Sequence, residues 1–235
     1  MPRTFGAIKA VILDLDDTLY DCSGTLVHSR RLKAAGVIAN AIGCSEKEAY
    51  QLQNDLDESS SVSGDLYEEI ARRYSLPAGF MEEINRKFSE VGIGGIKPFA
   101  GVTDTLKKLK KEGILLFLVT AGKPEEQEKK VRVLGLDGLF DETTLLDTTA
   151  VGADTKKACF KEILDSRHLK AEEVLCVGDR MDRELKVAKE LGIPTAMVRH
   201  GRHYRRFSSN STGDNEEAPD TYIESVADLS RILDR

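Results

Sequence analysis

Acidic side chains follow directly on a short apolar run near the start of the chain. Ala10 to Leu13 carries no charge and leads into Asp14, Asp16 and Asp17, while no Lys or Arg follows until Arg30. Burying such carboxylates without a counter-charge is costly, so a divalent cation is the simplest partner. The available ligands are hard oxygens without His or Cys, which favours Mg²⁺. Taken alone, this motif fits a solvated acidic turn equally well.

A second polar motif follows a second apolar run. Leu115 to Val119 leads into Thr120 and Ala121, and Pro124 then favours the start of a helix. A hydroxyl beside main-chain N–H groups and the positive end of a helix can bind phosphate. We therefore expect Thr120 and Ala121 to contact a substrate phosphate. A plain helix cap at Thr120 is the alternative.

A third motif supplies more acidic groups after Val174 to Val177. Asp179 follows Gly178 and is expected to complete the metal site, with Glu184 and Asp182 orienting metal-bound water. Lysines 156 and 157 lie just ahead, and either can balance negative charge. Helical geometry turns successive side chains by about 100°. Because Lys156 stands four residues before Phe160, whose ring should face the sheet, we expect Lys156 to point toward the site.

Apolar runs that alternate with helical patterns predict a doubly wound, Rossmann-like α/β core with a parallel sheet. The expected strands are Ala10 to Leu13, Ile114 to Val119, Val174 to Val177 and Thr195 to Val198. Ligands in such sheets bind at the carboxyl ends of the strands. The three motifs all follow predicted strands, so we expect them to meet at one edge.

The alternation is interrupted over residues 20–97, where only amphipathic helical patterns occur. We expect this insertion to fold as a small all-helical cap domain. Residues 1–19 and 98–235 would then form the core domain.

The ordered motifs resemble the four signature motifs of the haloacid dehalogenase-like hydrolase superfamily. The residues that carry the resemblance are Asp14 to Leu19, Thr120, Lys156 and Gly178-Asp179. The helical insertion is similar to that family's cap placed after the nucleophile. Two features depart from the usual pattern: the lysine motif lacks Lys-Pro-x-Pro, and Glu184 stands where many relatives have Asp.

The resemblance implies a Mg²⁺-dependent phosphatase acting on a small phosphomonoester through an aspartyl-phosphate. Asp14 would be the nucleophile and Asp16 the general acid and base, with Asp14, Asp16 and Asp179 serving the metal. As an acid, Asp16 would need a raised pKa. A dehalogenase needs no acid at this position, so we reject that activity. A phosphomutase and a non-catalytic binding protein remain as alternatives.

Composition limits the partners and the setting. A formal charge of −6 and the absence of Trp argue against a nucleic-acid or anionic-membrane surface. Four cysteines without metal-binding spacing suit a reducing compartment, so we expect a cytoplasmic protein that is a monomer or a homodimer. Arg199 to Arg206 is predicted to be a solvated basic loop, with His200 and His203 on the surface.

Overall fold

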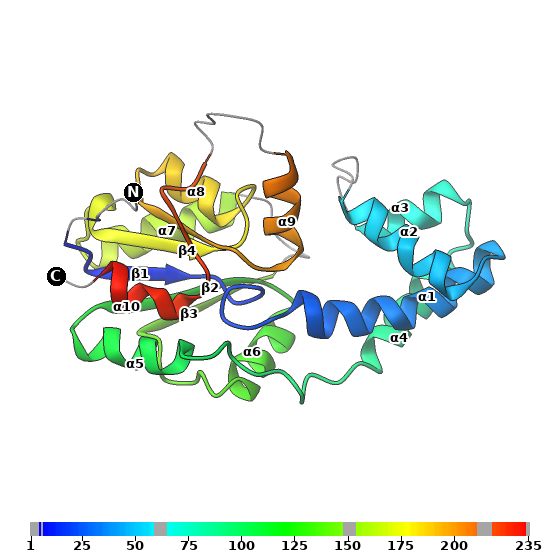
Figure 1. Ribbon diagram of the computed structural model, residues 1–235, viewed down its shortest axis with the longest axis horizontal. Coiled ribbons are helices and arrows are strands. Elements are labelled where there is room, and N and C mark those ends of the chain that lie inside the picture. Colours follow the sequence, from blue (N-terminus) through cyan, green and yellow to red (C-terminus); the bar gives the residue numbers. More distant parts are fainter. Residues whose placement is uncertain (1–4, 6, 59–64, 148–153, 211–217, 234–235) are drawn as a thin grey trace. The chain divides into compact units, whose positions relative to one another are not determined.

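The computed structural model describes residues 5, 7–58, 65–147, 154–210 and 218–233 of the 235-residue chain. It divides into two compact units, each described by itself (Figure 1). The core unit comprises Met1–Cys22 and Ile96–Arg235, and the helical unit comprises Ser23–Gly95. Among the described residues, no helix combines the length and the apolar character needed to cross a bilayer.

The core unit is built on one six-stranded parallel sheet with the order β3-β2-β1-β4-β5-β6. This confirms the predicted α/β, Rossmann-like fold. The strands are β1 (Ala10–Leu13), β2 (Leu115–Gly122), β3 (Glu142–Asp147), β4 (Val174–Gly178), β5 (Thr195–Val198) and β6 (Thr221–Ile223). β1 and β4 are adjacent although the chain winds outward from them in opposite directions. A crevice for ligands is expected at this switch in strand order.

The two outermost strands were not predicted. β3 is partly exposed and reads Glu-Thr-Thr-Leu-Leu-Asp, while β6 has only three residues. A strand at the edge of a sheet is covered less completely, so it does not need the continuous apolar run by which β1 and β4 are recognised. Their pairing with β2 and β5 was therefore not visible in the local sequence pattern.

Helices cover both faces of the sheet (Figure 1). One face carries α5 (Val102–Lys111), α6 (Pro124–Val133) and the C-terminal α10 (Leu229–Ile232); the other carries α7 (Asp154–Ser166), α8 (Glu184–Glu190) and α9 (Gly201–Asn210). Short 3₁₀ helices, η2 (Ala171–Glu173) and η3 (Val226–Asp228), precede β4 and α10. The core under α7 and α8 contains Ile12, Phe117, Phe160, Cys176 and Leu185, all buried. The ring of Phe160 therefore faces the sheet, as expected.

The prediction of a basic loop over Arg199 to Arg206 was wrong, because residues 201–210 form helix α9. Its apolar side chains Tyr204 and Phe207 pack against the core, while Arg205 between them is exposed. Burial of these two rings offsets the charge density that suggested a loop. His203 is half-buried and not a surface residue.

The helical unit holds no strand among its described residues. It begins with η1 (Ser23–Val27), a π-helical turn, and continues with α1 (His28–Ile42), α2 (Glu46–Glu58), α3 (Leu66–Arg73) and α4 (Gly79–Ser89). The unit has its own core around Ala35, Ile38, Ile70 and Ile84. A separate core is what allows an insertion to fold as a unit.

Candidate active site

The sheet brings the three chemical motifs to one edge. Leu13 at the end of β1 is paired with Leu118 of β2 and with Val177 of β4. Asp14 and Gly178 are therefore level across β1 and β4, and Thr120 lies two residues beyond Leu118 on β2. Parallel strands end at the same edge, so this register explains how motifs more than a hundred residues apart converge.

Three carboxylates share a buried space at this edge. Oxygen atoms of Asp14, Asp179 and Glu184 all lie within 4.8 Å of one another. Lys156 Nζ lies 3.2 Å from Asp14 Oδ1 and 2.8 Å from Glu184 Oε2. We call these four residues the Asp14 cluster. With three carboxylates and one ammonium group, the cluster carries a formal charge of −2 when all four groups are ionised.

Burial and mutual repulsion raise the pKa values of two carboxyl groups in the Asp14 cluster. Burial raises the pKa of Asp14 to about 7; Glu184 and Asp16 add to this rise, whereas Lys156 opposes it. Burial also raises the pKa of Asp179 well above its usual range, with Glu184 and Asp14 contributing. Asp179 is 2% exposed, and its buried Oδ2 atom has no hydrogen-bond partner among the described residues. A divalent cation held by Asp14 and Asp179 fits this charge and this buried acceptor.

Lys156 reaches the cluster and Lys157 does not. The Lys156 side chain is 10% exposed and donates to Asp14 and Glu184, whereas Lys157 is 37% exposed and pairs with Glu190 at 2.7 Å. Burial lowers the pKa of Lys156, but the charges of Asp14 and Glu184 outweigh it and keep the lysine protonated. The directions of the two side chains follow from the rotation of about 100° between successive residues of α7.

Within the Asp14 cluster, both carboxylate oxygens of Glu184 accept hydrogen bonds. Its Oε2 accepts from Lys156 Nζ, and its Oε1 accepts from the backbone N–H of Arg180 at 2.9 Å. A Cβ atom on Gly178 would lie 2.5 Å from Glu184 Oε1, so only glycine leaves room for this carboxylate. Asp182 lies outside the cluster, because its carboxylate is 64% exposed and pairs with Arg180 at 2.7 Å.

Asp16 occupies a different environment, which we call the Asp16 cradle. Tyr20 Oη donates to Asp16 Oδ1 at 2.5 Å, and Gln127 Nε2 donates to Oδ2 at 3.3 Å. Lys130 Nζ donates to both carboxylate oxygens, at 3.1 and 3.0 Å. The carboxylate that was expected to serve the metal is therefore directed to Lys130, and it is not part of the Asp14 cluster.

The pKa of Asp16 differs from the expectation. Burial acts to raise it, but the charge of Lys130 and hydrogen bonds from Tyr20, Lys130 and Gln127 outweigh burial, so the pKa lies below its ordinary value. The expectation of a raised pKa came from the role of Asp16 as a proton donor and not from the groups around it. It missed Lys130, which is 114 residues away in the chain.

Thr120 is buried at the end of β2, and its Oγ1 accepts a 2.6 Å hydrogen bond from Gln127 Nε2. Ala121 follows it and is half-buried. β2 continues to Gly122, beyond the predicted end at Val119, because residues 120–122 pair with β3. Gln127 thereby joins the hydroxyl of the second motif to the carboxylate of the first.

The sequence reasoning missed Tyr20, Gln127 and Lys130. Gln127 and Lys130 are one turn apart on α6 and are both buried, as is Val131 beside them. This i, i+3, i+4 spacing defines the inward face of a helix. Polar residues at inward positions of the helix that follows Thr120 were a signal that could have revealed them.

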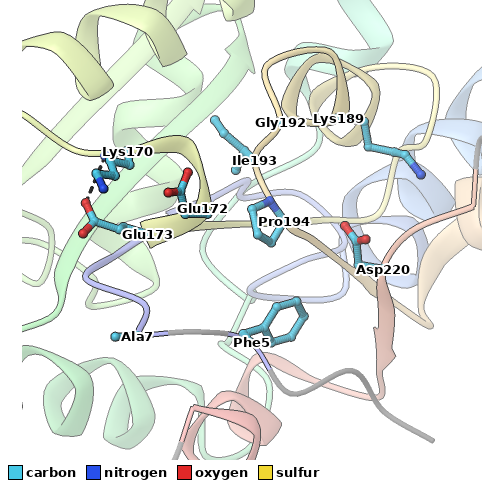
Figure 2. A pocket seen from close by; sticks show the side chains of 10 residues that line it. All are labelled: Phe5, Ala7, Lys170, Glu172, Glu173, Lys189, Gly192, Ile193, Pro194 and Asp220. Carbon is cyan, nitrogen blue, oxygen red and sulfur yellow. Dashed lines mark hydrogen bonds between the residues drawn. The ribbon is translucent and has the colours of Figure 1, made fainter.

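A cavity of about 630 Å³ lies at the opposite edge of the sheet, near the amino ends of β4 and β5. Figure 2 shows Lys189 and Asp220 among its lining side chains. These groups serve the fold: Lys189 Nζ donates to the carbonyl oxygen of Ala218, and Asp220 accepts from the backbone N–H of Thr195 at 2.9 Å. The cavity therefore lies away from the candidate chemistry.

A doubly wound sheet with acidic residues after β1 and β4, a hydroxyl on β2 and a lysine on α7 defines a class of hydrolases. Residues 11–198 match the model of the haloacid dehalogenase-like hydrolase family. The chain belongs to this family, and it is an enzyme of the phosphatase type.

Particular relatives cover almost the whole chain. A glyceraldehyde 3-phosphate phosphatase of Methanocaldococcus jannaschii is 28% identical over 96% of this chain and 97% of its own. A phosphoglycolate phosphatase of Aquifex aeolicus is 26% identical over 97% of each chain. The crystal structure of a predicted phosphoglycolate phosphatase from Haemophilus somnus has a TM-score of 0.72 at 20% identity, covering 97% of this chain and 99% of that one. This structural likeness concerns the fold.

Proposed function

We propose that the chain is a Mg²⁺-dependent phosphatase that hydrolyses a small phosphomonoester through a phosphoryl group on Asp14. One observation carries the proposal. Asp14 Oδ1 accepts a 3.2 Å hydrogen bond from Lys156 Nζ, and carboxylate oxygens of Asp14 and Asp179 lie within 4.8 Å of each other. The buried Oδ2 atom of Asp179 has no hydrogen-bond partner among the described residues. This arrangement provides a nucleophile, a counter-charge and a place for a cation within one buried cluster.

In the first step an Asp14 oxygen forms a bond to phosphorus while the bond from phosphorus to the leaving oxygen breaks. Asp16 donates a proton to that leaving oxygen, which departs as an alcohol. Lys130 and the hydrogen bonds around Asp16 hold its pKa below the ordinary value, so the proposed mechanism requires that bound substrate raise this pKa. A phosphate dianion placed beside the cradle would raise the pKa of Asp16 through repulsion of like charges.

In the second step a water oxygen attacks phosphorus and the bond to Asp14 breaks, which releases inorganic phosphate. Asp16, now a carboxylate, accepts the proton of the attacking water. Hydrogen bonds from Tyr20, Gln127 and Lys130 favour this ionised form. These contacts support a role for ionised Asp16 as the base of the second step.

Charge on the transferring phosphoryl group requires positive partners. A bound Mg²⁺ would supply electrostatic stabilisation of this charge and of the Asp14 carboxylate. Lys156 would contribute a fixed positive charge beside Asp14, and Thr120 with the Ala121 N–H group would donate hydrogen bonds to phosphate oxygens. These roles are distributed over α7 and the end of β2.

The relatives named above support a substrate of two or three carbon atoms. Their names specify glyceraldehyde 3-phosphate and phosphoglycolate. We propose that a short aliphatic phosphomonoester of this kind is the substrate. Its alkoxide leaving group is strongly basic, which suits an enzyme that supplies a proton donor.

A phosphate-release screen tests the proposal. The panel contains glyceraldehyde 3-phosphate, phosphoglycolate, hexose phosphates, nucleotides and pyrophosphate, each with Mg²⁺ and with excess chelator. We expect Mg²⁺-dependent release that is greatest for short aliphatic monoesters, and a hydroxylamine-sensitive acyl phosphate on Asp14. Isomerisation of a sugar phosphate without phosphate release would instead indicate a phosphomutase. The absence of both phosphate release and phosphoryl transfer would contradict an enzymatic role for this site.

A further inference from the structure

We propose that Lys130 is a positioning residue that holds the Asp16 carboxylate for proton transfer. The inference rests on the proposed function, because it concerns how the proposed acid and base is oriented. Four donated hydrogen bonds from Tyr20, Gln127 and Lys130 converge on the two oxygens of Asp16. Lys130 supplies two of them, and it is the group in the cradle that contacts both oxygens.

The number of donors fixes the orientation of the carboxylate. Hydrogen bonds from the cradle restrain both oxygens of the carboxylate, and the long 3.3 Å bond from Gln127 is the one expected to yield when Asp16 carries a proton. Rotation of the Asp16 side chain would break several of these bonds together. The cradle therefore sets one orientation of Asp16 before substrate arrives, which is the kind of preorganisation that proton transfer needs.

The position of Lys130 on α6 makes this contact directional. Its side chain is 5% exposed, and its ammonium group also lies 3.4 Å from Glu126 Oε1. Gln127 lies one turn earlier on the same face and joins Asp16 to Thr120. One helix thus aligns the proposed proton donor with the proposed phosphate-binding hydroxyl.

Lys130 has a second, electrostatic effect, which is to reduce repulsion between Asp16 and the Asp14 cluster. Lys156 pairs with Asp14 and Glu184, whereas Lys130 pairs with Asp16 and also lies 3.4 Å from Glu126 Oε1. Without Lys130, Asp16 would be an additional uncompensated carboxylate close to a cluster whose formal charge is already −2. Repulsion from Asp14 would then compete with the orientation that proton transfer requires.

Stability alone is a weak reason to bury this lysine. Removing an ion pair from water is costly, and apolar replacements are often as stable. A long buried apolar side chain could fill the same space beside α6. The specific feature of lysine here is its pair of hydrogen bonds to the carboxylate that is proposed to move protons.

Lys130→Met tests the inference, with Lys129→Met as the matched control because Lys129 is the next residue on α6 and is exposed. Both variants are assayed with a series of phosphomonoesters whose leaving groups range from 4-nitrophenol to simple alcohols. We expect Lys130→Met to lose roughly 100-fold in kcat/KM for alkyl esters and less than about fivefold for 4-nitrophenyl phosphate, because protonation matters most for basic leaving groups. Lys129→Met should match wild type on every substrate.

A double-mutant cycle with Asp16→Asn separates positioning from folding. If Lys130 acts through Asp16, Lys130→Met should cause less than about a threefold further loss in the Asp16→Asn background. Equal losses on aryl and alkyl esters, or the full loss persisting without Asp16, would overturn the inference. The proposed function would stand in that case, provided that Asp16→Asn itself shows the leaving-group dependence.

If Lys130→Met does not fold, Gln127→Leu provides the same test without changing a charge. It removes one donor to Asp16 and the link to Thr120, so we expect a smaller loss, about tenfold, again concentrated on alkyl esters. Thermal unfolding is measured for each variant. A leaving-group-independent loss in Gln127→Leu would contradict the cradle as a positioning device, whereas a leaving-group-independent loss in Asp16→Asn would contradict Asp16 as the acid.

Discussion

Asp14 and Asp16 are separated by a single residue, yet they lie in opposite electrostatic settings. Asp14 shares its surroundings with two other carboxylates and one lysine, and burial raises its pKa to about 7. Asp16 has its own lysine and two neutral donors, which hold its pKa below the ordinary value despite burial. The first site leaves a deficit of positive charge that a cation can fill, whereas the chain itself balances the second.

The difference explains how one short loop can support two chemical roles. Side chains that project in different directions after β1 meet different helices: Asp14 meets Lys156 of α7, and Asp16 meets Lys130 of α6. These helices cover opposite faces of the sheet (Figure 1). We therefore expect that the proposed nucleophile and the proposed proton carrier can be tuned independently, although they are neighbours in sequence.

The largest expected effect comes from Asp14→Asn, which reduces the negative charge of the Asp14 cluster and removes the proposed nucleophile together. We expect phosphate release to fall by roughly 10⁴-fold or more, on aryl and alkyl esters alike. The metal-free variant should unfold at a higher temperature than metal-free wild type, because one buried carboxylate no longer repels its neighbours. Activity assays and calorimetry in chelator measure both. Retention of wild-type turnover would exclude Asp14 as the nucleophile.

The two adjacent lysines of α7 provide the next comparison. Lys156→Met should reduce kcat/KM by about 10² to 10³-fold at saturating Mg²⁺, because it removes the fixed charge beside Asp14 and the transferring phosphoryl group. Lys157→Met should remain within about twofold of wild type, since Lys157 pairs only with Glu190 among the contacts that the structure describes for it. Steady-state kinetics of both variants check this. The reverse pattern would assign the role to Lys157.

Metal-linked stability distinguishes the two carboxylate sites directly. A ligand present at 100 times its dissociation constant stabilises a protein by about 2.7 kcal/mol. We expect Mg²⁺ to raise the unfolding temperature of wild type and of Lys130→Met to similar extents, because the Asp16 cradle is not the expected ion site. Asp179→Asn should abolish most of this response. Loss of the response in Lys130→Met would show that the two sites are not independent.

The smallest effect concerns His203, which belongs to neither site. Burial and nearby arginines lower its pKa from 6.5 to about 2. Because the unfolded chain binds the proton more readily, His203 favours the folded state above pH 6.5, and this contribution is lost as the pH falls. The loss between pH 6.5 and 5 amounts to at most about 2 kcal/mol.

His203→Asn should therefore flatten the decline in stability over this pH interval. Chemical denaturation at several pH values, with Mg²⁺ and with chelator, measures the change. The pH effect should persist in chelator, which separates it from the metal-linked stability of the Asp14 cluster. An unchanged pH profile in His203→Asn would show that His203 is protonated equally in both states.

Several features were predictable because they depend on local pattern. Buried central strands are continuous apolar runs, so Ala10–Leu13 and Thr195–Val198 were recognised with their final bounds. Residues that follow such strands must lie at the carboxyl edge of a parallel sheet, so the sequence alone predicted that Asp14 and Asp179 lie close together. The choice of Lys156 over Lys157 followed from helix periodicity and one apolar anchor, Phe160.

The sequence by itself determined the class of fold and the edge of the sheet at which the candidate site lies. It named the residues of the Asp14 cluster, although it also expected Asp16 to serve the metal and Asp182 to orient its water. Only the tertiary structure decided that β3 and β6 complete the sheet, that residues 201–210 form a helix, and that Asp16 pairs with Lys130. Strands and helices can be predicted locally, because the spacing of apolar residues along the chain shows which positions are buried. The pKa of Asp16 depends on which charged group lies about 3.0 Å from its carboxylate. That group is Lys130, which stands on α6, 114 residues further along the chain.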